Sequence, residues 1–236
     1  TVDGTWRRGT PGAMKSVLDE ALQSTPSVQH VVVLRHLGDA LACPMSPGRD
    51  HDWAEAIAEQ ASELPTAEMQ ADDAAVLLYT SGTTGKPKGA VRSHRASAML
   101  SLVTSVEMGL GRADTPLLVM PLCHGNSLFY FGVANYCSAT CSIYSRKSFD
   151  PEHVVATLAA GGISFTSLVP THYIMMLALP AKLRGRYNLD SVRKLLISSA
   201  PARRDTKLEI MEFFRNSGLY EGYGSTEAGW VTMLHP

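Results

Sequence analysis

Between residues 77 and 89 the chain changes abruptly from apolar side chains to hydroxyls, glycines and lysines. The apolar run 77–79 predicts a buried strand, and the glycines after it let the backbone bend and approach a ligand closely. Backbone N–H groups, hydroxyls and ammonium groups in one short loop are suited to holding anionic oxygen atoms. Polyphosphate would use all of them at once. The candidate phosphate-binding residues are Thr80, Ser81, Gly82, Thr83, Thr84, Gly85, Lys86 and Lys88.

A glycine-rich surface turn with two solvated lysines is the simpler interpretation of this loop. The phosphate interpretation is favoured because residues 80–89 contain four hydroxyls, three glycines and two lysines directly after an apolar run. The loop is not a Walker A loop, which has four residues between its first glycine and a Gly-Lys pair followed by Ser or Thr. Here two residues separate Gly82 from Gly85, and Pro87 follows Lys86.

Two further places offer polar groups with a possible role in chemistry. His124 follows a predicted strand at 116–120, and α/β folds place ligands at the ends of strands. A lone histidine is more often structural, so both interpretations of His124 stay open. Glu227 ends the run Tyr223, Gly224, Ser225, Thr226, which by itself is also compatible with a strand end and a solvated acid. A carboxylate beside phosphates would act through a divalent cation.

Residues 79–89 resemble the phosphate loop of the adenylate-forming enzymes, which include acyl-CoA synthetases, luciferases and peptide-synthetase adenylation domains. Residues 223–227 resemble the second strong motif of that superfamily, Tyr-Gly-x-Thr-Glu, in the right order along the chain. The resemblance implies that ATP activates a carboxylic acid as an acyl adenylate, with Mg²⁺ present. It also implies transfer of the acyl group to a thiol, here expected to be coenzyme A.

The resemblance also implies roles for individual residues. The ring of Tyr223 would lie on the adenine beside Gly224 and Ser225, while Thr226 would reach the phosphate and Glu227 would hold the magnesium ion. His124 stands where the family carries a Phe-His or Cys-His pair beside the carboxylate. The candidate catalytic residues are therefore His124, Thr226 and Glu227. The small-residue loop that packs on the adenine corresponds to Ser199, Ala200 and Pro201.

Gly224 gives an expectation about the substrate. In acetyl-CoA synthetases, which the opening of this chain resembles, the motif looks like Trp-Trp-Gln-Thr-Glu, and the second tryptophan restricts the acyl pocket. Aligning on Thr226 and Glu227 places Gly224 at that tryptophan, so we expect a medium-chain, long-chain or aromatic acid. The alternative is that Gly224 serves only the backbone turn, and that side chains such as Trp230 fill the space.

Composition excludes several classes of protein. The chain has 236 residues, 45% hydrophobic and 18% charged, with a net charge of -1, which is typical of a globular protein without a nucleic-acid surface. Its four cysteines show neither a disulfide framework nor metal-ligand spacing, so we expect buried, reduced thiols. The chain shows no signal peptide, and proline interrupts its most apolar stretch, 163–179. These features predict a cytoplasmic protein without a membrane span, and a homo-oligomer is left open.

Helical and strand patterns alternate along the chain, which predicts an α/β fold with layered, largely parallel sheets and flanking helices. The expected organisation is a partial α/β subdomain over 1–70 and a nucleotide- and acyl-binding α/β subdomain over 71–236. Thr10 and Pro11 are expected to begin a helix as N-cap and first helical residue. Ser93 is expected to cap a helix that runs to residue 106. Further helices are expected at 52–64, 151–160 and 205–214, and strands at 30–34, 141–144, 164–169 and 193–198.

The family continues beyond these motifs to an aspartate that holds the ribose and to a small C-terminal domain with a catalytic lysine. We expect both to lie outside these 236 residues, together with a portion before Thr1, and the isolated chain to be inactive. Two alternatives to an acyl-CoA synthetase stay open. One is an amino-acid-activating adenylation domain of a peptide synthetase, although His124 and Asn126 stand where its aspartate is expected. The other is a truncated, non-catalytic nucleotide-binding module.

Overall fold

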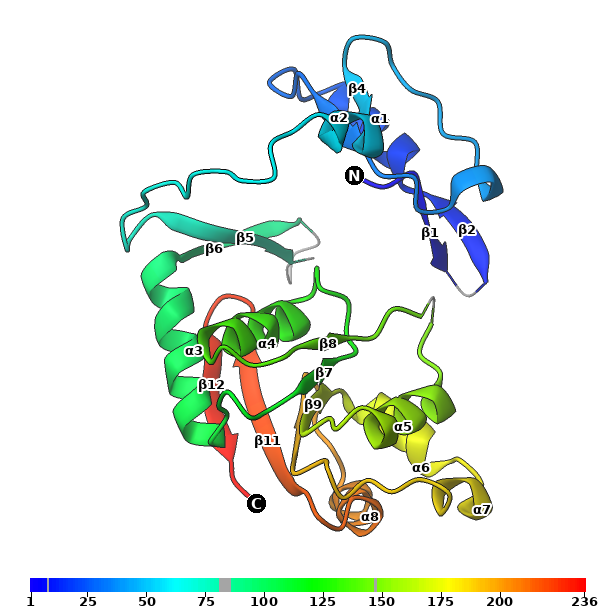
Figure 1. Cartoon of the computed structure of the whole chain (residues 1–236), viewed down its shortest axis with the longest axis vertical. Coiled ribbons are helices and arrows are strands. Elements are labelled where there is room, and N and C mark those ends of the chain that lie inside the picture. Colours follow the sequence, from blue (N-terminus) through cyan, green and yellow to red (C-terminus); the bar gives the residue numbers. More distant parts are fainter. Residues whose placement is uncertain (8, 81–85, 147) are drawn as a thin grey trace. The chain divides into compact units, whose positions relative to one another are not determined.

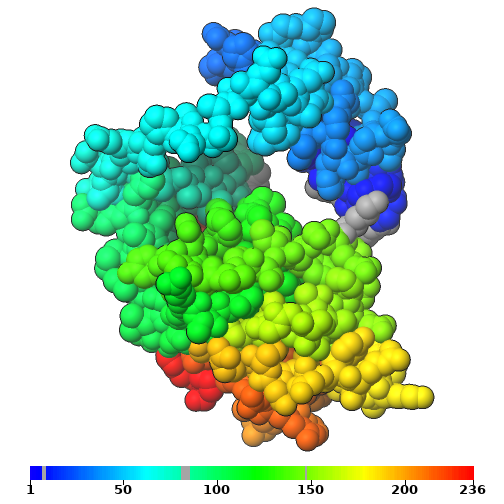
Figure 2. Space-filling view, in the orientation of Figure 1, coloured from blue at the N-terminus to red at the C-terminus, as the bar shows by residue number. Residues whose placement is uncertain are grey.

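A computed structural model describes residues 1–7, 9–80, 86–146 and 148–236. The chain divides into two compact units, Thr1–Glu68 and Met69–Pro236, and each is described by itself. Figure 1 colours them from blue to cyan and from cyan to red, and in Figure 2 the green-to-red part of the second unit forms one continuous mass. The roles expected for the two parts stay predictions.

The first unit contains two small sheets and two short helices. Strands β1 (Gly4–Arg7) and β2 (Thr10–Ala13) are antiparallel, and β3 (Val31–Val33) is parallel to β4 (Asp50–Asp52). Helices α1 (Met14–Leu22) and α2 (Trp53–Ala58) pack beside them, with a 3-10 helix at Gly38–Ala40.

Two predictions for this unit are wrong in their boundaries. Pro11 lies opposite Trp6 in the β1–β2 pair, so Thr10 begins a strand and helix α1 begins only at Met14. Proline is accepted there because a two-stranded sheet consists of edge strands. Helix α2 ends at Ala58 rather than 64, and Leu64 is 91% exposed, so the end of the expected helix has no core to pack on.

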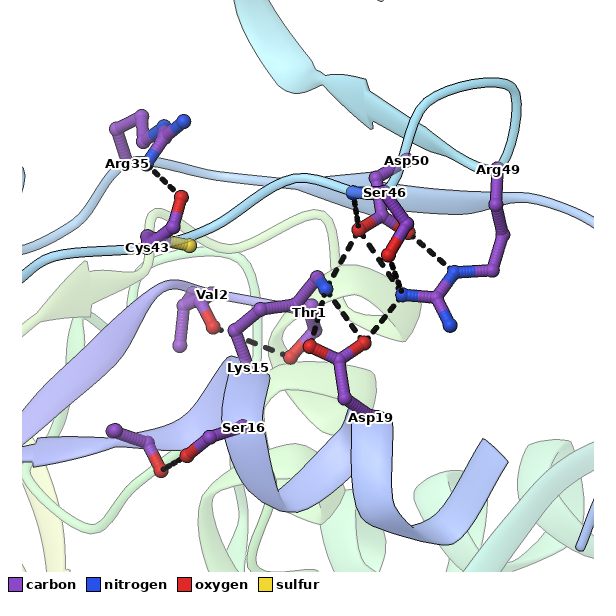
Figure 3. Close-up of polar contacts among 11 residues, drawn as sticks. Thr1, Val2, Lys15, Ser16, Asp19, Arg35, Cys43, Ser46, Arg49 and Asp50 are labelled. Carbon is purple, nitrogen blue, oxygen red and sulfur yellow. Dashed lines mark hydrogen bonds and ion pairs between the residues drawn. The ribbon is translucent and has the colours of Figure 1, made fainter. Parts of the chain in front are cut away.

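Four charged side chains join α1 to β4 in the first unit (Figure 3). Lys15 Nζ lies 2.7 Å from oxygens of both Asp19 and Asp50, and Arg49 Nε lies 2.6 Å from Asp50. Arg49 also pairs with Asp19. The hydrogen bond from Arg49 holds the pKa of Asp50 well below its usual range. Lys15 and Asp50 are almost completely buried, which is tolerable because each charge is paired.

The second unit is built on a six-stranded sheet in the order β12-β11-β10-β9-β7-β8. Every pair in it is parallel except β11–β12. The strands are β7 (Pro116–Leu118), β8 (Ser142–Ile143), β9 (Phe165–Leu168), β10 (Lys194–Ser198), β11 (Gly218–Ser225) and β12 (Gly229–Leu234). The predicted α/β fold with a largely parallel sheet is confirmed.

Helices cover both faces of this sheet (Figure 1). Leu195 and Ile197 of β10 belong to one apolar cluster and Leu196 to another, because successive side chains of a strand point to opposite faces. The first cluster includes residues of α5 (Pro151–Ala160), α6 (Pro170–Leu177) and α8 (Arg204–Phe213). The second includes residues of α3 (His94–Met108) and α4 (Gly125–Tyr136). The short helix α7 (Ala181–Arg184) follows α6.

A separate hairpin of β5 (Ala74–Thr80) and β6 (Lys88–Ser93) flanks the candidate phosphate loop. The expected buried strand is wrong for one face of β5, because Leu77 and Tyr79 are 52% and 71% exposed. Ser93 caps α3 as predicted, accepting a hydrogen bond from the Ala96 N–H at 3.2 Å.

The four cysteines are free thiols. Cys123 is exposed and the other three are half-buried, so the expectation of buried thiols is wrong for Cys123. None of the helices in the described parts of the chain has the length and apolar character needed to cross a membrane.

Candidate functional site

A cavity of about 450 Å³ opens in the second unit, between the hairpin, helices α3 and α4, and the strand ends of the six-stranded sheet. Ser198 and Ser199 reach it from the end of β10, and His124 from the segment between β7 and α4. Ligands commonly bind at the carboxyl ends of parallel strands in α/β folds. Most of the wall is apolar, formed by Val76, Leu78, Leu100, Leu128, Phe129, Leu196 and Trp230.

The structure brings together part of the predicted site. Six of the predicted residues line the cavity, namely His124, Ser199, Tyr223, Gly224, Ser225 and Thr226. Ala200, Pro201, Glu227, Lys86 and Lys88 are exposed and do not line it. Thr80 and Lys88 are strand partners at the base of the phosphate loop. The remaining predicted loop residues, Ser81, Gly82, Thr83, Thr84 and Gly85, lie outside the described residues.

His124 is the N-cap of helix α4. Its Nδ1 accepts a hydrogen bond from the backbone N–H of Asn126 at 3.2 Å. In a neutral imidazole one nitrogen accepts and the other carries the proton, so this cap assigns the proton to Nε2. His124 therefore has a hydrogen-bond donor left for a ligand, which suits a carboxylate.

Asn126 fixes the start of α4 against the sheet. Its Nδ2 donates to Ser167 Oγ at 2.9 Å and to Ser198 Oγ at 3.2 Å, which joins α4 to the ends of β9 and β10. Its Oδ1 is buried without a partner in the described residues. Asn126 lines the cavity as well. The sequence considered Asn126 only as a replacement for an expected aspartate, and nothing local signals its contacts with strands so far away in the chain.

Ser199 has a φ of +71°, in the left-handed region that residues other than glycine seldom adopt. Such strained residues occur at ligand sites, held by their surroundings. Ser199 follows β10 directly, and the chain turns there, leaving Ala200 and Pro201 exposed.

Gly224 has a backbone role that the sequence left open. A Cβ at this position would lie 2.1 Å from the carbonyl oxygen of Gly229 on the partner strand β12, so no side chain fits. Trp230 lines the cavity, and its ring centroid lies 6.2 Å from that of Phe129. The geometry thus supports the alternative in which Gly224 serves the backbone, although Gly224 also borders the cavity.

Arg92 is a lining residue that the sequence analysis missed. It lies on β6 opposite Val76, and its Nη2 donates to the backbone oxygen of Thr226 at 3.0 Å. The hairpin that flanks the phosphate loop is thereby tied to the turn of the second motif. Strand alternation places Arg92 on the same face as Val76, but the identity of that face is set by the fold.

No group of three His, Cys, Asp or Glu side chains that could hold a metal ion occurs within the described ranges. Glu227 alone offers the carboxylate oxygens that Mg²⁺ prefers. It is exposed and forms no ion pair with any described residue. A metal at Glu227 would take its remaining ligands from water and from phosphate oxygens, which is usual for Mg²⁺.

Known proteins resemble the chain over almost its whole length. It is 31% identical over 233 residues to the acetyl-coenzyme A synthetase of Methanothrix thermoacetophila, covering 92% of this chain and 33% of that protein. It is 29% identical over 159 residues to 4-coumarate--CoA ligase-like 2 of Arabidopsis thaliana, covering 66% of this chain and 27% of that protein. The chain spans a third or less of these relatives.

Solved structures share the fold. The O-succinylbenzoate coenzyme A synthetase of Bacillus subtilis, in complex with ATP and magnesium ion, superposes with a TM-score of 0.71 at 22% identity, covering 93% of this chain and 44% of that one. The luciferase-like enzyme of the Zophobas morio mealworm gives a TM-score of 0.71 at 21% identity, covering 92% of this chain and 54% of that one. The family model described as AMP-binding enzyme matches residues 10–236. The chain belongs to the AMP-binding enzyme family.

Proposed function

We propose that the protein activates a carboxylic acid with ATP, forming an acyl adenylate, and transfers the acyl group to coenzyme A. The observation that carries this proposal is the single apolar cavity on which His124, Ser199 and the Tyr223–Thr226 segment converge. The hairpin that flanks the phosphate loop forms another part of the same wall, through Val76 and Leu78. An apolar pocket with a few polar groups is the usual form of a small-molecule site.

In this proposal one oxygen of the carboxylate attacks the α-phosphorus of ATP, and pyrophosphate leaves. Thr80, Lys86, Lys88 and the loop between them hold the pyrophosphate, while Thr226 contacts the α-phosphate. Glu227 holds Mg²⁺, which supplies positive charge to the phosphates. The Nε2–H of His124 donates to the carboxylate and orients it. Catalysis of this kind depends on positioning and charge stabilisation. The thiol of coenzyme A then attacks the acyl carbonyl carbon, and AMP leaves.

The test is ATP–pyrophosphate exchange by the complete natural polypeptide with a panel of fatty, aromatic and amino acids. Exchange with a carboxylic acid, followed by thioester formation with coenzyme A, is the expected result. Exchange only with amino acids would instead indicate a peptide-synthetase adenylation domain. Nucleotide binding without exchange would indicate a non-catalytic module.

Replacing Lys88 by alanine is expected to lower the turnover by about 10-fold to 10²-fold, because an ammonium group is lost from the developing charge of pyrophosphate. The melting temperature should stay nearly unchanged, since Lys88 is exposed. The matched control is Lys182→Ala, which removes an exposed lysine on α7. Unfolding of the Lys88 variant without a separate kinetic defect would show that the loop is structural.

The proposed substrate is a medium-chain, long-chain or aromatic acid rather than acetate. The apolar cavity supports this choice, but Gly224→Trp is a poor test because its Cβ would collide with backbone. Gly132 on α4 is better placed, since it lines the cavity and a Cβ there meets only Ser101 Oγ, at 3.6 Å. We therefore use Gly132→Leu to fill the cavity.

Gly132→Leu is expected to lower kcat/KM for octanoate or benzoate by about 10-fold to 10²-fold while sparing propionate, because each methylene excluded costs roughly 0.8 kcal/mol. Gly132→Ala is the control and should behave like the wild type. A wild type that prefers acetate, or a loss that is equal for all acids, would contradict the proposed substrate.

A further inference from the structure

The wall of the cavity is mostly apolar, yet it contains a guanidinium group. Arg92 lines the cavity and is half-buried. Its Nη2 donates to the Thr226 backbone oxygen at 3.0 Å, and none of its other N–H groups bonds to a described residue. An arginine has five N–H donors and is always charged. Most of its hydrogen-bonding capacity is therefore left for a ligand.

The charge of Arg92 is also unbalanced. The described residues that line the cavity include neither aspartate nor glutamate, and residues 81–85, which lie outside the description, contain no acidic residue. Arg92 forms no ion pair with any carboxylate in the described chain, whereas Lys194 pairs with Asp114 and Lys207 with Glu221. A partly buried charge without a counter-ion is unfavourable. An anionic group on the bound ligand would supply the missing partner.

The position of the guanidinium indicates which ligand carries this anion. A Cβ on Gly229 would lie 2.9 Å from Arg92 Nη2, 3.1 Å from Nη1 and 3.0 Å from Leu100 Cδ2. The guanidinium group thus lies against the β11–β12 turn beside Leu100 of α3. Its neighbours there are apolar, whereas the predicted nucleotide contacts Ser199 and Tyr223 come from β10 and β11. The acid is the ligand that fits an apolar wall.

We propose that Arg92 binds a second carboxylate on the acid substrate, so that the site selects dicarboxylic acids over monocarboxylic acids of the same size. This inference rests on the proposed function and deepens it. The planar guanidinium matches a carboxylate in a two-pronged hydrogen bond, which gives geometric specificity as well as affinity. The first carboxylate of the same molecule remains the group that is adenylated.

The test compares matched acids in ATP–pyrophosphate exchange by the complete polypeptide, at saturating ATP. The pairs are adipate with hexanoate, and terephthalate with 4-methylbenzoate. The wild type is expected to have a kcat/KM at least about tenfold higher for the diacid of at least one pair. Arg92→Gln is expected to lower that value by about 10²-fold, mainly through KM, while the monoacid is little affected. Arg92→Lys should recover part of the loss, and the control Arg204→Gln, on the surface of α8, should change nothing.

Three results would overturn the inference. The first is a wild type that prefers the monoacid of both pairs, a measurement that does not depend on any variant folding. The second is an equal loss for diacids and monoacids in Arg92→Gln, which would give Arg92 only the structural role of holding the Thr226 turn. The third is a raised KM for ATP with every acid, which would assign Arg92 to a phosphate. Absence of exchange with any acid refutes the proposed function itself, and so is distinct from these results.

Discussion

Replacing Glu227 by glutamine is expected to lower adenylation by a factor of about 10²–10³, the usual cost of losing one electrostatic contact to a transition state. Glu227 lies in the turn between β11 and β12, where it is exposed and unpaired within the described chain. The substitution removes one negative charge and keeps the shape, so the fold has little reason to change. The amide is a weaker ligand for Mg²⁺ than the carboxylate.

The measurement is the rate of ATP–pyrophosphate exchange as a function of Mg²⁺ concentration, and the Glu227 variant should require more Mg²⁺ than the wild type. Glu209→Gln is the matched control, because Glu209 is an exposed glutamate on α8 outside the cavity. A variant with an unchanged rate and an unchanged Mg²⁺ dependence would remove Glu227 from the proposed site.

Replacing Asp3 by alanine is expected to destabilise the first unit by about 3–5 kcal/mol. The Asp3 side chain is 1% exposed and accepts hydrogen bonds from four backbone N–H groups, at distances of 2.7–3.1 Å. The donors are Gly4 and the consecutive residues His36, Leu37 and Gly38. Alanine would leave these donors without a partner. Urea unfolding and hydrogen exchange of these amides measure the effect.

The control is Asp39→Ala, since Asp39 is exposed in the 3-10 helix that follows the same amides. Equal stability of the two variants would contradict the role of Asp3. Burial raises the pKa of Asp3, but the hydrogen bonds from Leu37, Gly4, His36 and Gly38 outweigh it and lower the pKa. The stabilisation is therefore complete above the unfolded pKa of about 4 and is lost as the pH falls through the lower folded pKa. Asp3→Asn should abolish this part of the acid sensitivity.

Local sequence determined the features that depend on neighbouring residues. Ser93 caps α3, and Pro151 opens a helix that ends at Ala160 as expected, because capping and proline geometry act within one helical turn. The alternation of helices and strands likewise led to the confirmed α/β fold. The two motifs were visible because each concentrates its polar groups in a short stretch, and their resemblance to adenylate-forming enzymes agrees with the family of the chain.

Tertiary structure decided which side chains meet across long separations in the chain. Arg92 and Thr226 are 134 residues apart, and Asn126 and Ser198 are 72 apart, so no local pattern could signal either contact. Strand pairing likewise gave Gly224 its backbone role, since the colliding atom belongs to β12. One face of β5 is exposed because a two-stranded hairpin has no second layer of its own, and hydrophobicity along the chain does not show what covers a strand. Sequence thus specified residue types and local conformation, while the packing of distant strands determined which of those residues share a site.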